Sequence, residues 1–163
     1  MNNITERGSQ YPEQQPLLEL SRESREVLTI ALEEAAKFGN KYIDTSGVLI
    51  GLSQIGELGE KLRALDVNPQ TVRDIRDKIY KVQADTNIPV PKPTTAIEKW
   101  GQLPLTERMH KIALMVSRKA TLERREIIEI EDILDVIIEE RGGIAARVLQ
   151  SMNIGKQAFL NNQ

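Results

Sequence analysis

Apolar residues recur at intervals of three and four over most of the chain, from about residue 20 to residue 160. The first clear stripe consists of Val27, Ile30, Ala31, Ala35 and Phe38. This spacing places the apolar side chains on one face of a helix. Because Gly39 follows directly and glycine is a common helix terminator, the pattern predicts an amphipathic helix that ends at about residue 38.

Three shorter helices are predicted to follow in the same half of the chain. Asp44 is an N-cap type of residue ahead of an apolar run, so a helix should begin there and break near Gly56. A third helix is expected over about residues 58–65. Asn68 followed by Pro69 predicts the start of a fourth, because proline suits the first helical position.

The second half of the chain repeats this order of elements. At an offset of 85 residues the cap and apolar positions agree in chemical class, as in the pairs Ser21 and Thr106, Val27 and Ile112, Ala35 and Ala120, Ile43 and Ile128, and Leu49 and Leu134. Later positions agree at an offset of 87, and the last short helix is expected around Phe159. We interpret this as an internal duplication, two four-helix repeats related by a pseudo-twofold axis.

Two segments lack helical periodicity. Residues 1–16 are polar, so they are predicted to form a flexible N-terminal tail. Four prolines in residues 85–104 predict a stiff connector, since proline fixes the backbone and removes a hydrogen-bond donor. Repeat 1 is then expected over residues 17–84 and repeat 2 over residues 105–163, with the two repeats forming one domain.

Composition supports an all-α fold class and argues against several functions. Aromatic residues make up only 4% of the chain, and Leu, Ile, Val and Ala dominate the apolar positions, which suits packed helices better than a β-sandwich. The formal charge of −2 gives no reason to expect nucleic acid as a partner. No run of eighteen apolar residues is present, so no membrane association is expected and a cytoplasmic location is the default.

The sequence contains few residues that could perform catalysis or bind a metal. There is no cysteine, and His110 is the only histidine, so we expect no metal site, no cofactor and no Ser-His-Asp arrangement. A Gly-x-x-x-x-Gly-Lys-Ser/Thr phosphate-binding loop is also absent. A hydrolase is therefore disfavoured, and the chain is expected not to be an enzyme.

One concentrated basic feature stands out, formed by Arg118, Lys119, Arg124 and Arg125. It lies at the end of the first helix of repeat 2 and in the loop that follows. The cluster could contact an acidic surface of a partner protein. Alternatively, it is a solvated turn that Glu123 and Glu126 balance in charge.

Several runs in this duplicated pattern resemble the double Clp N-terminal repeat that precedes the ATPase rings of ClpC- and ClpB-type unfoldases. The runs are Leu20-Ser21-Arg22-Glu23, Ile43-Asp44-Thr45, Val48-Leu49-Ile50-Gly51-Leu52, Leu105-Thr106-Glu107-Arg108, Glu131-Asp132-Ile133-Leu134 and Gly142-Gly143-Ile144-Ala145-Ala146-Arg147-Val148-Leu149. The last of these looks like the ClpC type. The resemblance implies protein partners: Clp ATPase or peptidase subunits, adaptors or substrate peptides. It also implies the plastid stroma as the location if the source is a plant.

The resemblance further implies a pocket for phosphorylated arginine in each repeat, built from a helix-start Ser or Thr and the Glu of a Thr-Glu-His motif. Repeat 2 matches with Thr106 and Glu131, whereas repeat 1 has Ser21 and Ser46 and so lacks the carboxylate. A hydroxyl and helix N–H groups favour a phosphoryl group, but a carboxylate is needed for the guanidinium. Repeat 2 is therefore expected to keep the pocket. Alternatively, Thr106 is only an N-cap and Glu131 only a first-turn acid.

Two functions from different classes remain. The first is a non-catalytic protein-binding or peptide-binding module of the Clp protease or chaperone machinery, acting either as a ClpC-type recognition domain or as a stand-alone accessory protein like ClpT. The alternative is a helical DNA-binding or regulatory protein that uses one short helix pair as a helix-turn-helix.

Overall fold

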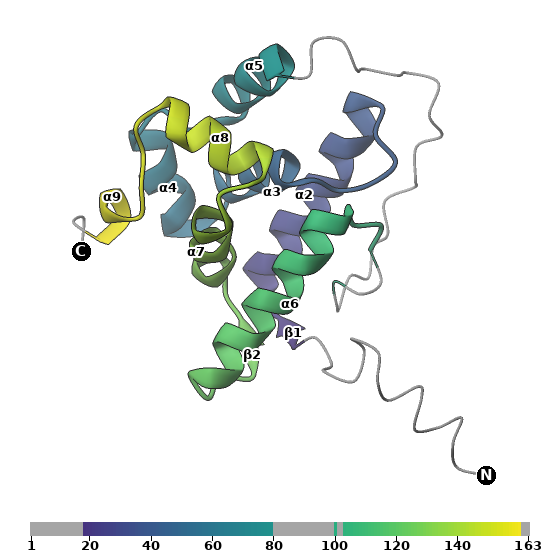
Figure 1. Ribbon diagram of the computed structural model, residues 1–163, viewed down its shortest axis with the longest axis vertical. Helices are drawn as coiled ribbons and strands as arrows, with labels where there is room; N and C mark the ends of the chain where they lie inside the picture. The colour runs from purple at the N-terminus through teal and green to yellow at the C-terminus, as the bar shows by residue number, and fades with distance from the viewer. Residues whose placement is uncertain (1–17, 80–99, 101–102, 161–163) are drawn as a thin grey trace.

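The computed structural model describes residues 18–79, 100 and 103–160, and in these ranges the regular structure is almost all helix (Figure 1). The elements are β1 Glu19–Leu20, α2 Arg22–Phe38, α3 Thr45–Leu52, α4 Gly56–Ala64, α5 Pro69–Ile79, α6 Glu107–Leu122, β2 Ile127–Ile128, α7 Ile130–Glu140, α8 Ile144–Ser151 and α9 Gln157–Leu160. The predicted all-α class is confirmed. The predicted tail and nearly all of the predicted connector lie outside the described residues.

The two long helices begin at the predicted caps. The Ser21 hydroxyl oxygen accepts a hydrogen bond from the Ser24 N–H at 3.1 Å, and the Thr106 hydroxyl oxygen accepts one from the Met109 N–H at 3.1 Å. Each bond satisfies one of the N–H groups that a helix start leaves without a partner. Gly39 closes α2 in the left-handed conformation, with φ of 81°, as its position after the stripe predicted.

The shorter helices of the first half differ slightly from the prediction. α5 begins at Pro69 as expected, and the Asn68 side-chain oxygen accepts a hydrogen bond from the Thr71 N–H at 2.9 Å. The helix expected from residue 58 begins two residues earlier, at Gly56. Gly56 has φ of 65°, so it makes the turn and starts the helix at once, where the sequence had predicted only a break.

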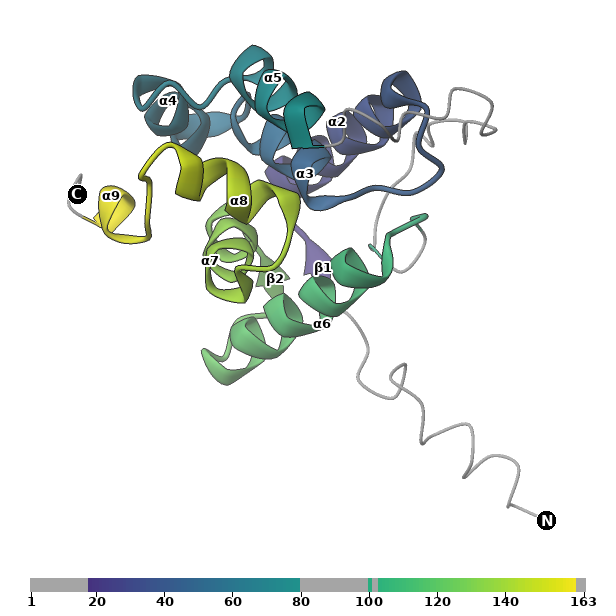
Figure 2. The ribbon, with the colours of Figure 1, turned by 45° about the horizontal axis from the view of Figure 1, so that its top comes forward.

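The two halves share one hydrophobic core, with α3 at its centre. Every residue of α3 is buried, and α3 contacts α2, α5, α7 and α8. The first two views agree in placing α3 among these helices (Figures 1 and 2). A helix that is apolar all round belongs in the interior. Val27 from the first half, Ile112 from the second half and Trp100 between them are all fully buried in this core.

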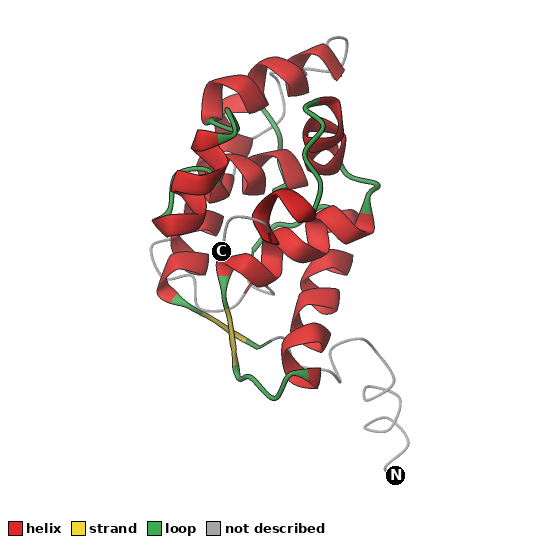
Figure 3. Ribbon diagram, turned by 90° about the vertical axis from the view of Figure 1, so that its left-hand side faces the viewer, coloured by secondary structure: helices red, strands yellow, loops and turns green. Residues whose placement is uncertain are grey.

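Two short parallel contacts connect the halves at equivalent positions. β1 pairs with β2 in parallel, Glu19 opposite Ile127 and Leu20 opposite Ile128, at one end of the molecule (Figure 3). At the other contact, Ile43 and Leu105 form an isolated parallel bridge. The segment before the first helix of each half thus pairs with the segment before the second helix of the other half.

Candidate functional site

Two junctions of helix starts follow from these parallel contacts, and they hold the residues predicted to bind a ligand. The first junction comprises residues 19–21 and 127–131, where α2 and α7 begin. The second junction comprises residues 104–106 and 42–46, where α6 and α3 begin. Each junction therefore combines a helix start from one half with a helix start from the other.

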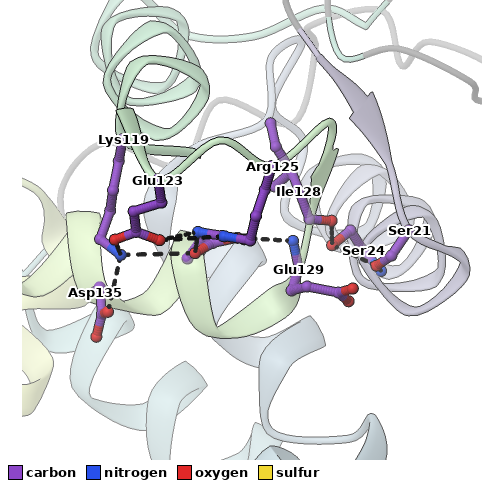
Figure 4. Close-up of polar contacts among 9 residues, drawn as sticks. Ser21, Ser24, Lys119, Glu123, Arg125, Ile128, Glu129 and Asp135 are labelled. Atoms are coloured by element: carbon purple, nitrogen blue, oxygen red, sulfur yellow. Dashed lines mark hydrogen bonds and ion pairs between the residues drawn. The ribbon is translucent and has the colours of Figure 1, made fainter. Parts of the chain in front are cut away.

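At the first junction, the Ile128 carbonyl oxygen accepts hydrogen bonds from the Ser21 N–H and from the Ser24 hydroxyl, both at 2.9 Å (Figure 4). The Ser21 hydroxyl in turn donates to the Ser24 hydroxyl oxygen at 2.9 Å. Glu131 lies exposed in the first turn of α7, three residues after Ile128. The hydroxyl of Ser21 and the carboxylate of Glu131 are therefore at the same end of the molecule.

At the second junction, the Thr106 N–H donates to the Ile43 carbonyl oxygen at 3.0 Å, which holds the α6 start beside the α3 start. Ser46 is buried, with 1% of its surface exposed, and its hydroxyl donates to an Asp44 carboxylate oxygen at 2.7 Å. The same carboxylate oxygen accepts from the Gly47 N–H at 3.1 Å. Ser46 is thus engaged in the start of α3.

The structure does not bring Thr106 and Glu131 together. Thr106 caps the start of α6, and Glu131 follows the other end of that helix. A helix of 16 residues is about 24 Å long. Glu131 instead shares the first junction with Ser21, and Thr106 shares the second with Ser46. The offset of 85 residues identifies equivalent positions, but only the parallel contacts reveal that each junction is built from both repeats.

A glycine turn closes the second junction. A Cβ atom on Gly143 would lie 2.6 Å from the Thr45 hydroxyl oxygen, and one on Gly142 would overlap the Arg108 guanidinium. Arg108 also pairs with Glu140 at the end of α7. Glycine is therefore required here for close packing between α3, α6 and the start of α8.

Two members of the predicted basic cluster, Lys119 and Arg125, form ion pairs with acidic residues of the same chain. Both terminal nitrogens of Arg125 donate to the Asp132 carboxylate at 2.6 Å. Lys119 pairs with Glu123 at 3.1 Å and with Asp135 at 3.6 Å. These ion pairs join the loop after α6 to α7.

Arg118 and Arg124 are the cluster members that are exposed. Arg124 adopts a left-handed conformation with φ of 60° in the turn that ends α6. The ion pairs of Lys119 and Arg125 with Glu123 are in keeping with the alternative of a turn whose charge is balanced.

The electrostatics of Asp132 reflect its place in this network. Burial raises the pKa of its carboxyl, but hydrogen bonds from Arg125 and from the Glu129 N–H, with the charges of Arg125 and Lys119, hold the pKa below its usual value. The hydrogen bonds from Arg125 to Asp132 and Glu123 raise the pKa of the Arg125 guanidinium. Asp132 is charged and fully engaged at neutral pH.

A second buried ion pair was not foreseen from the sequence. Glu34 on α2 is 3% exposed and accepts hydrogen bonds from Arg73 on α5 at 2.6 and 3.1 Å. Arg76 lies 3.7 Å from the same carboxylate and stacks on the Phe38 ring, 4.0 Å from its centroid. Because Glu34 and Arg73 are 39 residues apart in the sequence, no local pattern could have revealed this network.

Within the described residues, no helix is long and apolar enough to cross a membrane.

Comparison with known proteins connects this arrangement to the Clp ATPases. The chain is 28% identical over 137 residues to the ATP-dependent Clp protease ATP-binding subunit ClpA homolog of Cyanidium caldarium, a match that covers 83% of this chain. It is 30% identical over 132 residues to the chaperone protein ClpB of Oceanobacillus iheyensis, over 80% of this chain. The chain spans 15% of the length of each of these two relatives. No family model matches it.

A solved structure shares the fold. The N-terminal domain of the chaperone ClpD from Arabidopsis thaliana superposes with a TM-score of 0.64, covering 88% of this chain and 93% of that domain at 17% sequence identity. A chloroplastic ClpC2 chaperone of Oryza sativa is also similar, at 28% identity over 130 residues. The chain is thus similar in sequence to Clp ATP-binding subunits and chaperones, and it has the fold of the ClpD N-terminal domain.

Proposed function

We propose that the protein is a non-catalytic protein-binding module of the Clp protease or chaperone machinery. The observation that carries this proposal is its likeness to the ClpD N-terminal domain over 88% of the chain, combined with relatives that are Clp ATP-binding subunits and chaperones. The relatives named for ATP binding are proteins about seven times longer than this chain. This chain contains no Gly-x-x-x-x-Gly-Lys-Ser/Thr loop that could supply such chemistry.

Two variants of this function differ in the partner. In one, the module recognises adaptors or substrate peptides, as the ClpC-type resemblance implies. In the other, it acts as an accessory protein like ClpT and docks on the Clp complex. The proposed compartment is the cytoplasm, or the plastid stroma for a plant protein, and the chloroplastic relative is in keeping with the second setting.

The two junctions suggest how a phosphorylated arginine would be bound. At the first junction, the start of α2 offers the Ser21 hydroxyl and backbone N–H groups for the phosphoryl group, and Glu131 offers a carboxylate for the guanidinium. At the second junction, the position equivalent to Glu131 is Ser46, which has no charge and is engaged with Asp44. We propose that phosphoarginine prefers the first junction, which combines residues of both repeats.

An NMR titration with free phosphoarginine tests this ligand. Amide signals around Ser21 and Glu131 should shift, while those around Thr106 and Ser46 stay almost unchanged. Replacing Glu131 with Gln should weaken binding by about 1–3 kcal/mol, because the guanidinium loses a charged hydrogen-bond partner. Equal shifts at both junctions, or none at either, would contradict the proposal.

Affinity purification tests the wider function. The tagged protein is incubated with an extract of its own cells, and captured Clp subunits are quantified against a tagged helical protein of similar size and charge. Enrichment of the Clp peptidase core would favour docking, and enrichment of adaptors or arginine-phosphorylated proteins would favour recognition. Capture of neither would contradict the proposed function.

The DNA-binding alternative has less support. The relatives are described as Clp ATP-binding subunits and chaperones, and two of the four residues of the predicted basic cluster form ion pairs with Asp132, Asp135 and Glu123. A gel-shift measurement at low salt would test it, since binding to phosphates is strongest there.

A further inference from the structure

The exposed face of the β1 and β2 pair carries an apolar side chain among carboxylates. Side chains alternate between the two faces of a strand. Leu20 and Ile128 point into the core, so their neighbours Glu19 and Ile127 share the outer face, opposite each other in the parallel register. Ile127 is 46% exposed and is one of three large hydrophobic side chains exposed in the described part of the chain.

Three further acids lie within four residues of this apolar residue in the sequence. Glu126 precedes Ile127, and Glu129 and Glu131 follow it at the start of α7; all three are exposed. Among the residues that the structure describes, no Lys or Arg side chain forms an ion pair with any of these three or with Glu19, since nearby Arg125 pairs with Asp132 and Glu123, and Arg22 pairs with Glu26. We call Glu19, Glu126, Ile127, Glu129 and Glu131 the acidic face.

The equivalent surface at the second junction also exposes a large apolar side chain, but it carries fewer acidic residues. Tyr42 occupies the position of Ile127 at the offset of 85 residues and is 48% exposed. The positions of Glu126, Glu129 and Glu131 are held there by Lys41, Asp44 and Ser46. Both junctions therefore expose a large hydrophobic side chain beside paired helix starts, but only the first surrounds it with four carboxylates.

We propose that the acidic face binds a polypeptide segment in which unmodified Lys or Arg residues flank an apolar residue. The apolar residue would cover Ile127, and the basic side chains would pair with the carboxylates around it. Charge complementarity selects this occupant over a segment whose charged side chains are all acidic, because such a segment offers no cation to the carboxylates and is repelled by them. The proposal rests on the proposed protein-binding function and names the chemistry of the partner.

Fluorescence anisotropy with a labelled nonapeptide of alternating Lys and Leu tests this inference. Two peptides of equal length serve as controls, one with Glu in place of Lys and one with Ser in place of Leu. The Lys-Leu peptide should bind at least tenfold more tightly than either control, and its affinity should fall as salt is raised, because exposed charge pairs are screened. Comparable binding of the Glu-Leu peptide would overturn the proposal.

Variants of the protein locate the binding surface. Ile127→Ser should weaken the Lys-Leu peptide about tenfold, in keeping with the loss of one covered aliphatic side chain. The double variant Glu19→Lys, Glu131→Lys should weaken it by a similar factor. Both changes are at exposed positions, and far-UV circular dichroism and thermal unfolding verify the fold.

Matched substitutions provide the controls. Tyr42→Ser removes the equivalent apolar side chain at the second junction, and Glu60→Lys reverses an exposed charge on α4. Both should leave peptide affinity within twofold of the wild type. Wild-type affinity of Ile127→Ser, or an equal loss in Tyr42→Ser, would overturn the assignment of this face.

The affinity purification distinguishes this inference from the function on which it rests. If Clp subunits are captured but the Lys-Leu peptide does not bind, the acidic face is not the docking surface and the module function stands. If the peptide binds but no Clp component is captured, the acidic face is supported and the Clp-associated function is wrong.

Discussion

Thr45 caps a helix that belongs to the other half of the chain. Its hydroxyl oxygen accepts a hydrogen bond at 2.9 Å from the N–H of Ala145, the second residue of α8. The residue at the N-cap position of α8 is Gly143, which has no side chain to do this. Thr45 is 2% exposed, so the bond is shielded from water and joins the two repeats.

Replacing Thr45 with Val should lower the free energy of unfolding by about 1–2 kcal/mol, because it leaves a helix-start N–H without its cap in a buried setting. Urea denaturation followed by circular dichroism measures the change. Thr29→Val is the matched control, since the Thr29 hydroxyl only donates to the Arg25 carbonyl of its own helix near the surface. A loss no larger than that of Thr29→Val would show that the cap contributes little.

Gly143→Ala tests the same contact from the opposite side. The added methyl group would lie 2.6 Å from the Thr45 hydroxyl oxygen, closer than packed atoms tolerate, so we expect a loss of about 1–3 kcal/mol. Gly155→Ala is the control, because a Cβ atom there meets nothing within 4 Å. Thermal unfolding of the two variants should therefore differ clearly, and equal melting temperatures would contradict the close packing.

The sequence predicts those features of the fold that depend on residues close together in the chain. The caps Ser21 and Thr106, the stop at Gly39 and the apolar stripes all depend on neighbours within four residues, and the structure confirms each of them. The nearly constant offset between equivalent positions also predicts the internal duplication. These features suffice for the helical class and for most helix boundaries.

The candidate site required information that no local pattern carries. Ser21 meets Ile128 and Thr106 meets Ile43 only because β1, β2 and the Ile43 bridge pair across the repeats. The sequence pattern instead pairs the pocket residues within one repeat, and it leaves open whether Arg125 contacts a partner or is balanced by Glu123. Long-range contacts between side chains, such as Arg73 with Glu34, likewise become visible only once the helices are packed.

Stability should fall in acid because of Glu34. Burial raises the pKa of this carboxyl, but the hydrogen bonds and charge of Arg73, with the charges of Lys37 and Arg76, hold it below its ordinary value of 4.5. A lowered pKa in the folded state means that the stabilisation is present above pH 4.5 and is lost as the pH falls through the folded-state value. Asp132, whose pKa is also lowered, acts in the same direction.

Glu34→Gln should therefore destabilise the protein at pH 7 by about 2–4 kcal/mol, because half-buried Arg73 loses its counter-charge and buried Arg76 keeps only Asp77. The variant should also lose less stability than the wild type between pH 6 and pH 3. Urea titrations across this pH range measure both effects, with the exposed neighbour Glu33→Gln as the control. A wild-type pH dependence in Glu34→Gln would assign the acid sensitivity to other groups.

Engineered disulfides can test how the repeats are joined, and the absence of cysteine from the natural chain makes the result easy to read. Glu19 and Ile127 lie opposite each other in the parallel register, with both side chains on the exposed face, so Glu19→Cys with Ile127→Cys should form a disulfide in mild oxidant. Thr106→Cys with Glu131→Cys should not, because these positions flank opposite ends of α6. Mobility on non-reducing gels and thiol titration distinguish the two outcomes. Efficient closure of the second pair, with failure of the first, would mean that each junction is built within one repeat and would return the ligand site to Thr106 and Glu131.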